Sequence, residues 1–315
     1  MTSNPKVSIV IPVYNGSNYL KEAIDSALGQ TSKDVEVIVV NDGSNDGGQT
    51  EAIAKSYGDK IRYFYKENGG VASGLNLGIK NMRGEWFAWL SHDDLFSNNR
   101  IEQDLILIDK NPEAKVTFCM IKLIDSQGEI IGDIQYPIEK VTNCYEALTY
   151  VDMCTTTIHK SCFEKVGLFN ESKKTTQDVE MTLRLSRITP FYLNNKSITY
   201  KREHLNRGTY TLSEQHKKDL LDFCDLIHNE FSFNEFFPNL SDNEDEISNA
   251  WFYMGNLYYS WGATHYAEEC YSSAVLTHKN IFRRLIKRFN ITVLKRENPV
   301  IKQLLKNLYF LISSK

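Results

Sequence analysis

The first hundred residues alternate between short apolar runs and stretches with helical spacing, and this alternation constrains the fold more than any other feature. The apolar runs are rich in β-branched residues and too short for helices, so they predict strands buried on both faces. The stretches between them repeat apolar residues every three or four positions, which predicts helices that pack on a sheet. The predicted strands are 7–11, 35–40, 61–65 and 86–90, and the predicted helices are 19–28, 48–57, 72–82 and 100–109.

Such an alternation predicts an α/β fold, with a mostly parallel, Rossmann-like sheet covered by helices on both faces. Ligands bind these sheets at the carboxyl ends of the strands. Three of the predicted strands run directly into polar residues, namely Tyr14-Asn15, Asn41-Asp42 and His92-Asp93-Asp94. The topology therefore predicts a binding site along this edge of the sheet.

The character of the sequence changes near residue 212, where strand signals fade and helical spacing dominates. We expect an α/β domain over residues 1–211, completed by mixed strands and helices after 115, and a small all-α domain over 212–315. Residues 248–281 match the tetratricopeptide pattern at Trp251, Met254-Gly255, Tyr258, Ala267 and Tyr271. A single repeat has to stack on neighbouring helices. An ordinary helical hairpin is the alternative.

The net charge of −4 argues against general nucleic-acid binding, but the charge is unevenly spread. Residues 281–315 carry nine Lys and Arg against the single acid Glu297. Residues 298–313 combine an apolar helical stripe with Lys302 and Lys306 on the other face. This basic amphipathic tail could attach to an anionic membrane surface or an acidic protein. Alternatively, it caps the helical repeat.

The lack of a recognisable targeting signal and the spacing of the cysteines predict a cytoplasmic protein. The basic tail could also attach it to the inner face of the cell membrane. No apolar stretch reaches 18 residues, so no membrane-spanning helix is predicted. The apolar run near the N-terminus is too short for a signal peptide and contains Pro12. The six cysteines form no C-x-x-C pair or zinc spacing, which is typical of reduced, buried thiols.

Acidic residues at three places could carry chemistry. Of two adjacent carboxylates such as Asp93 and Asp94, one can bind a hard cation while the other binds a ribose hydroxyl, although Ser91 or Asp93 could simply cap the next helix. Asp42 could bind a nucleotide base or ribose, but Asp-Gly is also common in turns. Asp178 and Glu180 could supply a general base. Their alternative role is an acidic first helical turn, which the helix dipole favours.

Five segments together resemble family 2 glycosyltransferases, which have the GT-A fold. They occur in the family's order and at about its spacing, from residue 6 to about 210. The segments are KVSIVIPVYNG (6–16), VIVVNDGS (37–44), NGGVASGLNLGIK (68–80), WLSHDDL (89–95) and VGLFNESKKTTQDVEMTLR (166–184). The resemblance implies an inverting hexosyltransferase that moves a sugar from a UDP-sugar to an acceptor hydroxyl. The acceptor would be a glycan, a lipid-linked sugar or a glycoprotein.

The resemblance also implies a role for each matching position. The nucleotide-sugar would be bound by Pro12, Val13, Tyr14, Asp42, Asn76, His92 and Asp93. Asp94 would bind a divalent metal ion, Mn²⁺ or Mg²⁺, and His204 of the element Arg202-x-His204 would reach the metal or the diphosphate. Asp178 would deprotonate the acceptor hydroxyl, and Glu180 would orient the acceptor sugar.

Three positions depart from the family pattern, and two other function classes stay open. Ser91, Leu75 and Gln177 stand where the family often has Asp, Arg and Glu, although the carboxylates required by the mechanism are all present. One alternative is a catalytically silent binding or scaffold protein that acts through the helical repeat. A nucleotidyltransferase is disfavoured because residues 12–17 contain no Lys or Arg for a phosphate loop.

Overall fold

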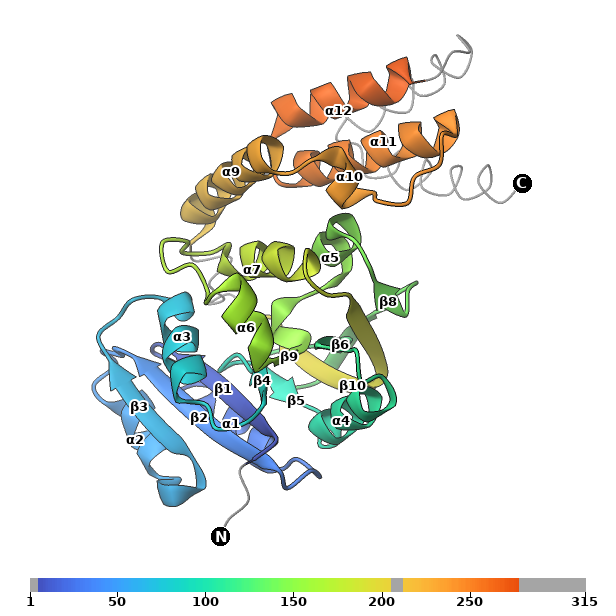
Figure 1. Cartoon of the computed structure of the whole chain (residues 1–315). Helices are drawn as coiled ribbons and strands as arrows, with labels where there is room; N and C mark the ends of the chain where they lie inside the picture. The colour runs from blue at the N-terminus through green and yellow to red at the C-terminus, as the bar shows by residue number, and fades with distance from the viewer. Residues whose placement is uncertain (1–4, 205–211, 278–315) are drawn as a thin grey trace. The chain divides into compact units, whose positions relative to one another are not determined.

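The structure, a computed structural model, describes residues 5–204 and 212–277 (Figure 1). The chain divides into two compact units, Met1–Asp219 and Leu220–Lys315. The division falls within helix α9 (Ser213–Glu230). The domain boundary predicted at residue 211 borders the segment 205–211, which lies outside the described residues, so it stays a prediction.

The first unit is built on a single mixed sheet of ten strands. The main path runs β3-β2-β1-β4-β9-β6-β10-β5, while β7 pairs with β6 and β8 pairs with β10. Strands β3, β2, β1 and β4 are parallel, as predicted, and β10 is parallel to β6. Strand β9 runs antiparallel to both of its neighbours, so the sheet is parallel on one side and mixed on the other. The strands are β1 (Val7–Val13), β2 (Val35–Asp42), β3 (Arg62–Lys66), β4 (Trp86–Trp89), β5 (Leu95–Phe96), β6 (Val116–Ile124), β7 (Ile130–Ile134), β8 (Lys140–Val141), β9 (Thr156–His159) and β10 (Phe191–Arg202).

Helices cover both faces of the sheet, which confirms the predicted α/β architecture (Figure 1). Apolar side chains of β1 alternate between two hydrophobic cores, with Val10 in one core and Ile9 and Ile11 in the other. The first core includes residues of α3 (Val71–Asn81), α5 (Cys144–Tyr150), α6 (Lys160–Val166) and α7 (Gln177–Ser186). The second core includes residues of α1 (Leu20–Leu28), α2 (Gln49–Lys55) and α4 (Arg100–Lys110). Two 3₁₀ helices, η1 (Gly58–Lys60) and η2 (Met153–Thr155), complete the described elements of this unit.

The second unit contains α10 (Phe233–Phe236) and a helical hairpin of α11 (Glu244–Ser260) and α12 (Thr264–Leu276). Gly255 allows the two long helices to approach, because a Cβ placed there would lie 2.5 Å from the Tyr271 ring. Trp251 stacks on Phe233 with ring centroids 3.8 Å apart. The helical hairpin is therefore observed, whereas its assignment as a tetratricopeptide repeat stays a prediction. The basic tail predicted over 281–315 lies outside the described residues.

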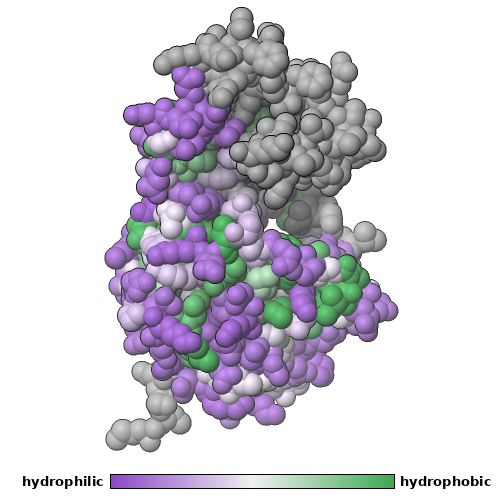
Figure 2. Space-filling view, turned by 90° about the vertical axis from the view of Figure 1, so that its right-hand side faces the viewer, coloured by the Kyte–Doolittle hydropathy of each residue, from purple (hydrophilic) through white to green (hydrophobic). Residues whose placement is uncertain are grey.

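The surface and the cysteines show no membrane-spanning or disulfide-linked feature in the described part of the chain. Hydrophilic residues dominate the face seen in Figure 2, and hydrophobic residues form smaller patches. Within residues 5–204 and 212–277, no helix is long and apolar enough to cross a bilayer. All six cysteines are free, and all except Cys154 are buried, as expected from their spacing.

Candidate active site

The loops after β1 and β2 are joined at the carboxyl edge of the sheet. The Asn15 backbone N–H donates to Ser44 Oγ at 2.9 Å, and the Asn45 N–H donates to Asn15 Oδ1 at 2.8 Å. Asn15 adopts φ 49°, a left-handed conformation that is uncommon outside glycine. Such backbone conformations persist where surrounding contacts enforce them, often in binding sites.

Of the three residues expected to line a nucleobase pocket, only Tyr14 presents its side chain to solvent. Tyr14 is 45% exposed. Val13 is buried in the core around α1, and Pro12 is buried with its Cβ facing Gly74. The side chains of Pro12 and Val13 therefore shape the base of the site, because strand β1 is buried on both of its faces.

Asp42 ends β2 and holds the loop that leads into α3. Its carboxylate accepts hydrogen bonds from Gly69 N at 3.0 Å and Gly70 N at 2.8 Å, and it pairs with Lys66 Nζ at 2.7 Å. Asp42 is only 3% exposed, so these partners inside the protein take the place of water around its carboxylate. Lys66 brings a cation to the strand ends, a residue that the sequence analysis did not select.

Asn76, expected near the donor, lies buried and clamps a distant loop. Its amide exchanges hydrogen bonds with the backbone of Phe169, at 2.9 Å in both directions, and also donates to Glu171 Oε1 at 2.8 Å. Both polar groups of the side chain are thus engaged within the protein. Asn76 therefore holds the loop at Phe169 in place, and its expected position near the donor stays a prediction.

The Asp93-Asp94 pair follows β4 and meets the end of β10. His204 Nε2 lies 3.0 Å from Asp93 Oδ2, and the Arg202 backbone N–H donates to Asp94 Oδ1 at 2.9 Å. Burial, followed by the neighbouring Asp93 charge, raises the pKa of Asp94 to about 7. Burial alone would also raise the pKa of Asp93, but His92 and the hydrogen bond with His204 outweigh it and lower that pKa. The two adjacent carboxylates therefore have opposite preferences for a proton.

Two further contacts fix this corner of the site. The Arg202 guanidinium is buried, pairs with Glu22 at 2.7 Å and lies 4.3 Å from the centre of the Tyr19 ring. The His92 ring packs closely on the loop after β1, where a Cβ on Gly16 would lie 2.4 Å from the ring. Burial lowers the pKa of His92, which favours its neutral form.

Asp178 lies in the first turn of α7, where the sequence placed it. Its side chain is partly buried, and its Oδ1 accepts the Val179 backbone N–H at 2.9 Å. Burial and then the charge of Asp152 raise the pKa of Asp178, which makes this carboxylate a stronger base than a solvated one. The preceding loop is anchored by Asp219, whose Oδ2 accepts the backbone N–H of Lys174 at 3.2 Å and of Thr175 at 3.0 Å.

Glu180, expected to orient the acceptor sugar, is paired with Arg184 on the same helix. Both of its carboxylate oxygens bind Arg184, at 2.8 and 2.7 Å, and Glu180 is 9% exposed. Arg184 also donates to the Leu168 carbonyl at 2.9 Å. The pair therefore ties α7 to the segment after α6. The side chains of Asp178 and Glu180 point in directions about 200° apart around the helix axis, because each residue of an α-helix adds about 100° of rotation.

Lys201 and Asp152 complete the site, and sequence reasoning missed both. They form an ion pair between the end of β10 and the start of η2, and both are partly buried. Lys201 precedes the Arg202-x-His204 element, which was the one signal that could have drawn attention to it. Asp152 belongs to no recognised pattern.

Several buried polar atoms near these residues have no hydrogen-bond partner within the described part of the chain. They are Trp89 Nε1, Thr176 Oγ1, Gln177 Oε1 and His204 Nδ1. A buried polar group without a partner costs about 1–3 kcal/mol, so such groups usually meet a ligand or water. Thr176 and Gln177 directly precede Asp178, and His204 contacts Asp93, which makes this region a candidate binding site.

Asp94 and His204, the residues expected to bind a metal ion, could supply some of the ligands of a divalent cation but not all of them. No group of three or more His, Cys, Asp or Glu side chains with metal-binding geometry occurs in residues 5–204 and 212–277. Asp94 nevertheless offers a second carboxylate oxygen, and His204 Nδ1 is buried without a partner in that same part of the chain. A hard cation can complete such a shell with ligand oxygens and water.

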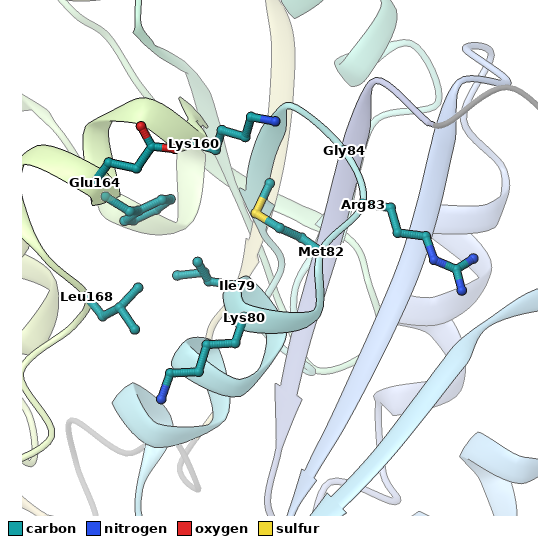
Figure 3. A pocket seen from close by; sticks show the side chains of 9 residues that line it. Ile79, Lys80, Met82, Arg83, Gly84, Lys160, Glu164 and Leu168 are labelled. Carbon is teal, nitrogen blue, oxygen red and sulfur yellow. The ribbon is translucent and has the colours of Figure 1, made fainter.

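A separate pocket of about 350 Å³ lies near the opposite ends of the strands (Figure 3). Gly84, in its lining, donates to Ser8 Oγ at the start of β1. Ile79, Met82 and Leu168 face the hollow, whereas the Arg83 side chain points away from it. None of the residues expected to bind the nucleotide-sugar, the metal ion or the acceptor lines this pocket.

Known proteins share sequence and fold with this chain. The profile of glycosyl transferase family 2 matches residues 8–167. An uncharacterized glycosyltransferase of Rickettsia typhi is 46% identical over 221 residues, which cover 68% of this chain and 69% of the relative. One from Rickettsia conorii is 43% identical over 71% of this chain, but the match covers 38% of that relative. This chain therefore spans well under half the length of some curated relatives that it matches.

Two solved structures share the fold at low sequence identity. Staphylococcus aureus TarS 1–349 in complex with UDP-GlcNAc has a TM-score of 0.58 at 18% identity, covering 86% of this chain and 90% of that one. The mannosyltransferase PcManGT of Pyrobaculum calidifontis, in complex with GDP-Man and Mn²⁺, has a TM-score of 0.59 at 16% identity, covering 99% and 86%. At these identities the likeness establishes the fold alone, and that fold is GT-A. Together with the match over residues 8–167, it shows that the chain is a member of glycosyl transferase family 2.

Proposed function

We propose that this protein transfers a sugar from a UDP-sugar to an acceptor hydroxyl, with inversion at the anomeric carbon and Asp178 as the general base. The observation that carries the proposal is the placement of Asp178. It lies at the carboxyl edge of the sheet, with its pKa raised by burial and by Asp152, beside buried polar atoms that lack partners in the described residues. Family membership and a structural neighbour that binds UDP-GlcNAc support the choice of reaction and donor.

The donor nucleotide would lie across the ends of β1, β2 and β4. Tyr14 offers an exposed aromatic ring beside the loops joined by Asn15. Asp42 and Lys66 hold the neighbouring loop. Asp93, whose pKa is lowered by His92 and by the hydrogen bond with His204, would accept a hydrogen bond from a ribose hydroxyl. Asn76 would act indirectly, by fixing the loop at Phe169.

Asp94 and His204 would hold a divalent ion, Mn²⁺ or Mg²⁺, which neutralises diphosphate charge when bound. A structural neighbour that carries Mn²⁺ supports the choice of ion. Asp94 accepts the Arg202 backbone N–H, so the end of β10 fixes the orientation of this carboxylate. The buried Arg202 guanidinium, paired with Glu22, keeps that strand end in place.

Asp178 would accept the proton of the acceptor hydroxyl as its oxygen forms the new bond to the anomeric carbon and the bond to UDP breaks. A carboxylate with a raised pKa is better matched to this task at neutral pH. The proposal does not extend to an acceptor contact by Glu180, because Arg184 occupies both of its oxygens.

Replacing the base tests the assignment. A panel of UDP-sugars (UDP-glucose, UDP-galactose and their N-acetyl forms) with Mn²⁺, screened for UDP release, identifies the donor. With that donor, Asp178→Asn should lower kcat by about 10²- to 10⁴-fold. UDP affinity, measured by calorimetry, should stay within a few-fold of wild type, because Asp178 belongs to the acceptor side.

Two outcomes would contradict the proposal. If Asp178→Asn keeps more than half of the wild-type kcat, the base lies elsewhere. If NMR of the product shows that the anomeric configuration of the donor is retained, the displacement is not inverting. Absence of turnover with every donor would favour the alternative of a silent scaffold protein.

A further inference from the structure

Three neighbouring parallel strands end in residues of different chemistry at the same level of the sheet. In the register of the sheet, Val13 of β1 lies beside Asn41 of β2, and Asp42 of β2 lies beside Lys66 of β3. Tyr14, which directly follows Val13, therefore leaves β1 at the level of the Asp42–Lys66 pair. Neighbouring strands are about 4.8 Å apart, so about 10 Å separates the ends of β1 and β3. An aromatic ring, a carboxylate and an ammonium group can thus meet one small ligand there.

The Lys66 ammonium group is fixed on its protein side and has one donor left. Nζ donates to Asp42 Oδ1 at 2.7 Å and to the Glu67 carbonyl, and a Cβ on Gly69 would lie only 2.9 Å from Nζ. An ammonium group has three N–H donors. Within the described residues two of them have partners. Because 23% of the Lys66 side chain is exposed, against 4% for Asp42, the third donor can reach a ligand.

Asp42 can accept one more hydrogen bond beside this ammonium group. Its Oδ1 accepts Lys66 Nζ and the Gly69 backbone N–H, whereas its Oδ2 accepts only the Gly70 N–H in the described part of the chain. A carboxylate can accept about four hydrogen bonds. The pair therefore presents a donor, Lys66 Nζ, next to an acceptor, Asp42 Oδ2.

A donor next to an acceptor matches one edge of uracil and not the same edge of cytosine. Uracil presents the acceptor O4 beside the donor N3–H. Cytosine has an amino group in place of O4 and an unprotonated N3, so its donor and acceptor are exchanged. Cytosine in the same position would bring two donors together at Lys66 and two acceptors together at Asp42. The Tyr14 ring, 45% exposed, could stack on either base and would not discriminate between them.

We propose that Lys66 determines which nucleobase the donor carries, by donating a hydrogen bond to O4 of uracil while Asp42 accepts one from N3–H. The inference rests on the proposed function, in which a UDP-sugar lies across the ends of β1, β2 and β4, and it names the residue that separates uracil from cytosine. A lysine that only neutralised the diphosphate would act equally on UDP and CDP, because the two nucleotides carry the same phosphates and ribose.

Calorimetric titration with UDP and with CDP, each in the presence of Mn²⁺, tests the role of Lys66. Wild type should bind UDP more tightly than CDP. Lys66→Met, which removes the donor and keeps most of the side-chain length, should weaken UDP binding by about 10-fold or more and CDP binding much less. Lys60→Met is the matched control, because Lys60 is an exposed lysine in η1, before the same strand. It should leave both affinities unchanged.

Equal weakening of UDP and CDP binding by Lys66→Met, or an unchanged preference for UDP, overturns the inference. If Lys66→Met does not fold, titration of wild type with 4-thio-UDP, in which sulfur replaces O4, still decides. Sulfur is the weaker acceptor, so 4-thio-UDP should bind less tightly than UDP, and equal affinity would contradict a contact at O4.

The two proposals fail separately. If the wild-type protein releases UDP from a UDP-sugar and Lys66→Met keeps the full preference for UDP over CDP, only the role of Lys66 is lost. If the wild-type protein does not bind UDP at all, the proposed donor is wrong, and the role of Lys66 is lost with it.

Discussion

At the residue scale, Asp93 and Asp94 show how neighbouring carboxylates acquire different properties from their partners. Asp93 lies beside His204 and has a lowered pKa, whereas Asp94 is buried, accepts the Arg202 backbone N–H, and has a pKa raised to about 7. An ordinary Asp has a pKa of 3.8. The folded state therefore holds the Asp94 proton over a pH range in which the unfolded chain has released it.

This difference predicts a stability cost at neutral pH. Because the folded pKa of Asp94 lies above the unfolded value, its contribution is present at about pH 4 and is lost as pH rises toward 7. In metal-free buffer with chelator, Asp94→Asn should raise the free energy of unfolding by about 2 kcal/mol at pH 8 and by much less at pH 4.5. Urea denaturation at both pH values measures the effect.

Asp93→Asn is the matched control, and it should have the opposite sign. The folded pKa of Asp93 is lowered, so its carboxylate contributes stability above the unfolded pKa, and that contribution is lost as pH falls. Asp93→Asn should therefore destabilise the protein at pH 8. Equal effects of the two variants would refute the asymmetry that burial and His204 create.

At the scale of elements, two glycines set how closely α3 packs on the sheet. A Cβ on Gly78 would lie 2.3 Å from Val10 Cγ1 of β1, whereas a Cβ on Gly74 would lie 3.2 Å from Pro12 Cβ. Gly78→Ala should lower the free energy of unfolding by about 1–3 kcal/mol, because the contact forces the helix away from the strand.

Gly74→Ala is the control on the same helix. Alanine is more favourable than glycine in a helix by about 1 kcal/mol. This gain should offset much of the cost of the looser contact between the new Cβ at position 74 and Pro12. Thermal denaturation followed by circular dichroism compares the two variants. Equal melting temperatures would show that α3 can shift without cost. Val10→Ala should partly rescue Gly78→Ala if the contact with Val10 causes the loss.

The start of α9 acts on the site through the loop that precedes α7. Asp219 accepts the backbone N–H groups of Lys174 and Thr175, and its Oδ2 also lies 2.9 Å from Thr175 Oγ1. Asp219→Ala should release this loop and lower kcat several-fold, because the adjacent Asp178 would lose its fixed position. UDP affinity should stay unchanged. A parallel loss of UDP affinity would instead indicate general unfolding of the unit.

At the scale of the whole molecule, the proposed donor and acceptor residues all lie in the first compact unit, between residues 12 and 204. A chain that ends at Lys279 should therefore keep UDP affinity. It should also lose any binding to anionic liposomes at low salt, since it lacks the nine basic residues of 281–315. Sedimentation and calorimetry of both chains measure this. Equal pelleting, or none by either chain, would favour the alternative in which the tail only caps the repeat.

The parallel strands near the N-terminus, the helices between them and the sheet edge proposed to bind the donor could be predicted from the sequence. Strand β1 is one apolar run, and the residues predicted to face the core on α1 (Leu20, Ala23, Ile24, Ala27) are all buried. The spacing of apolar residues is a local property of the sequence, so it predicts strands and helices without knowledge of the tertiary structure. The position of Asp42, Asp93 and Asp178 at strand and helix ends follows from the same local signals.

Contacts between side chains that are distant in the sequence could not be predicted from it. Lys201 and Asp152 are separated by 49 residues, and Asn76 and Phe169 by 93, so no local pattern pairs them. The spacing of Glu180 and Arg184 did carry a local signal, since charges four residues apart on a helix attract each other. The burial of Glu180, and the contact of its partner Arg184 with the Leu168 carbonyl, nevertheless depend on the fold. Charge states likewise depend on burial and on distant partners, which a linear sequence does not contain.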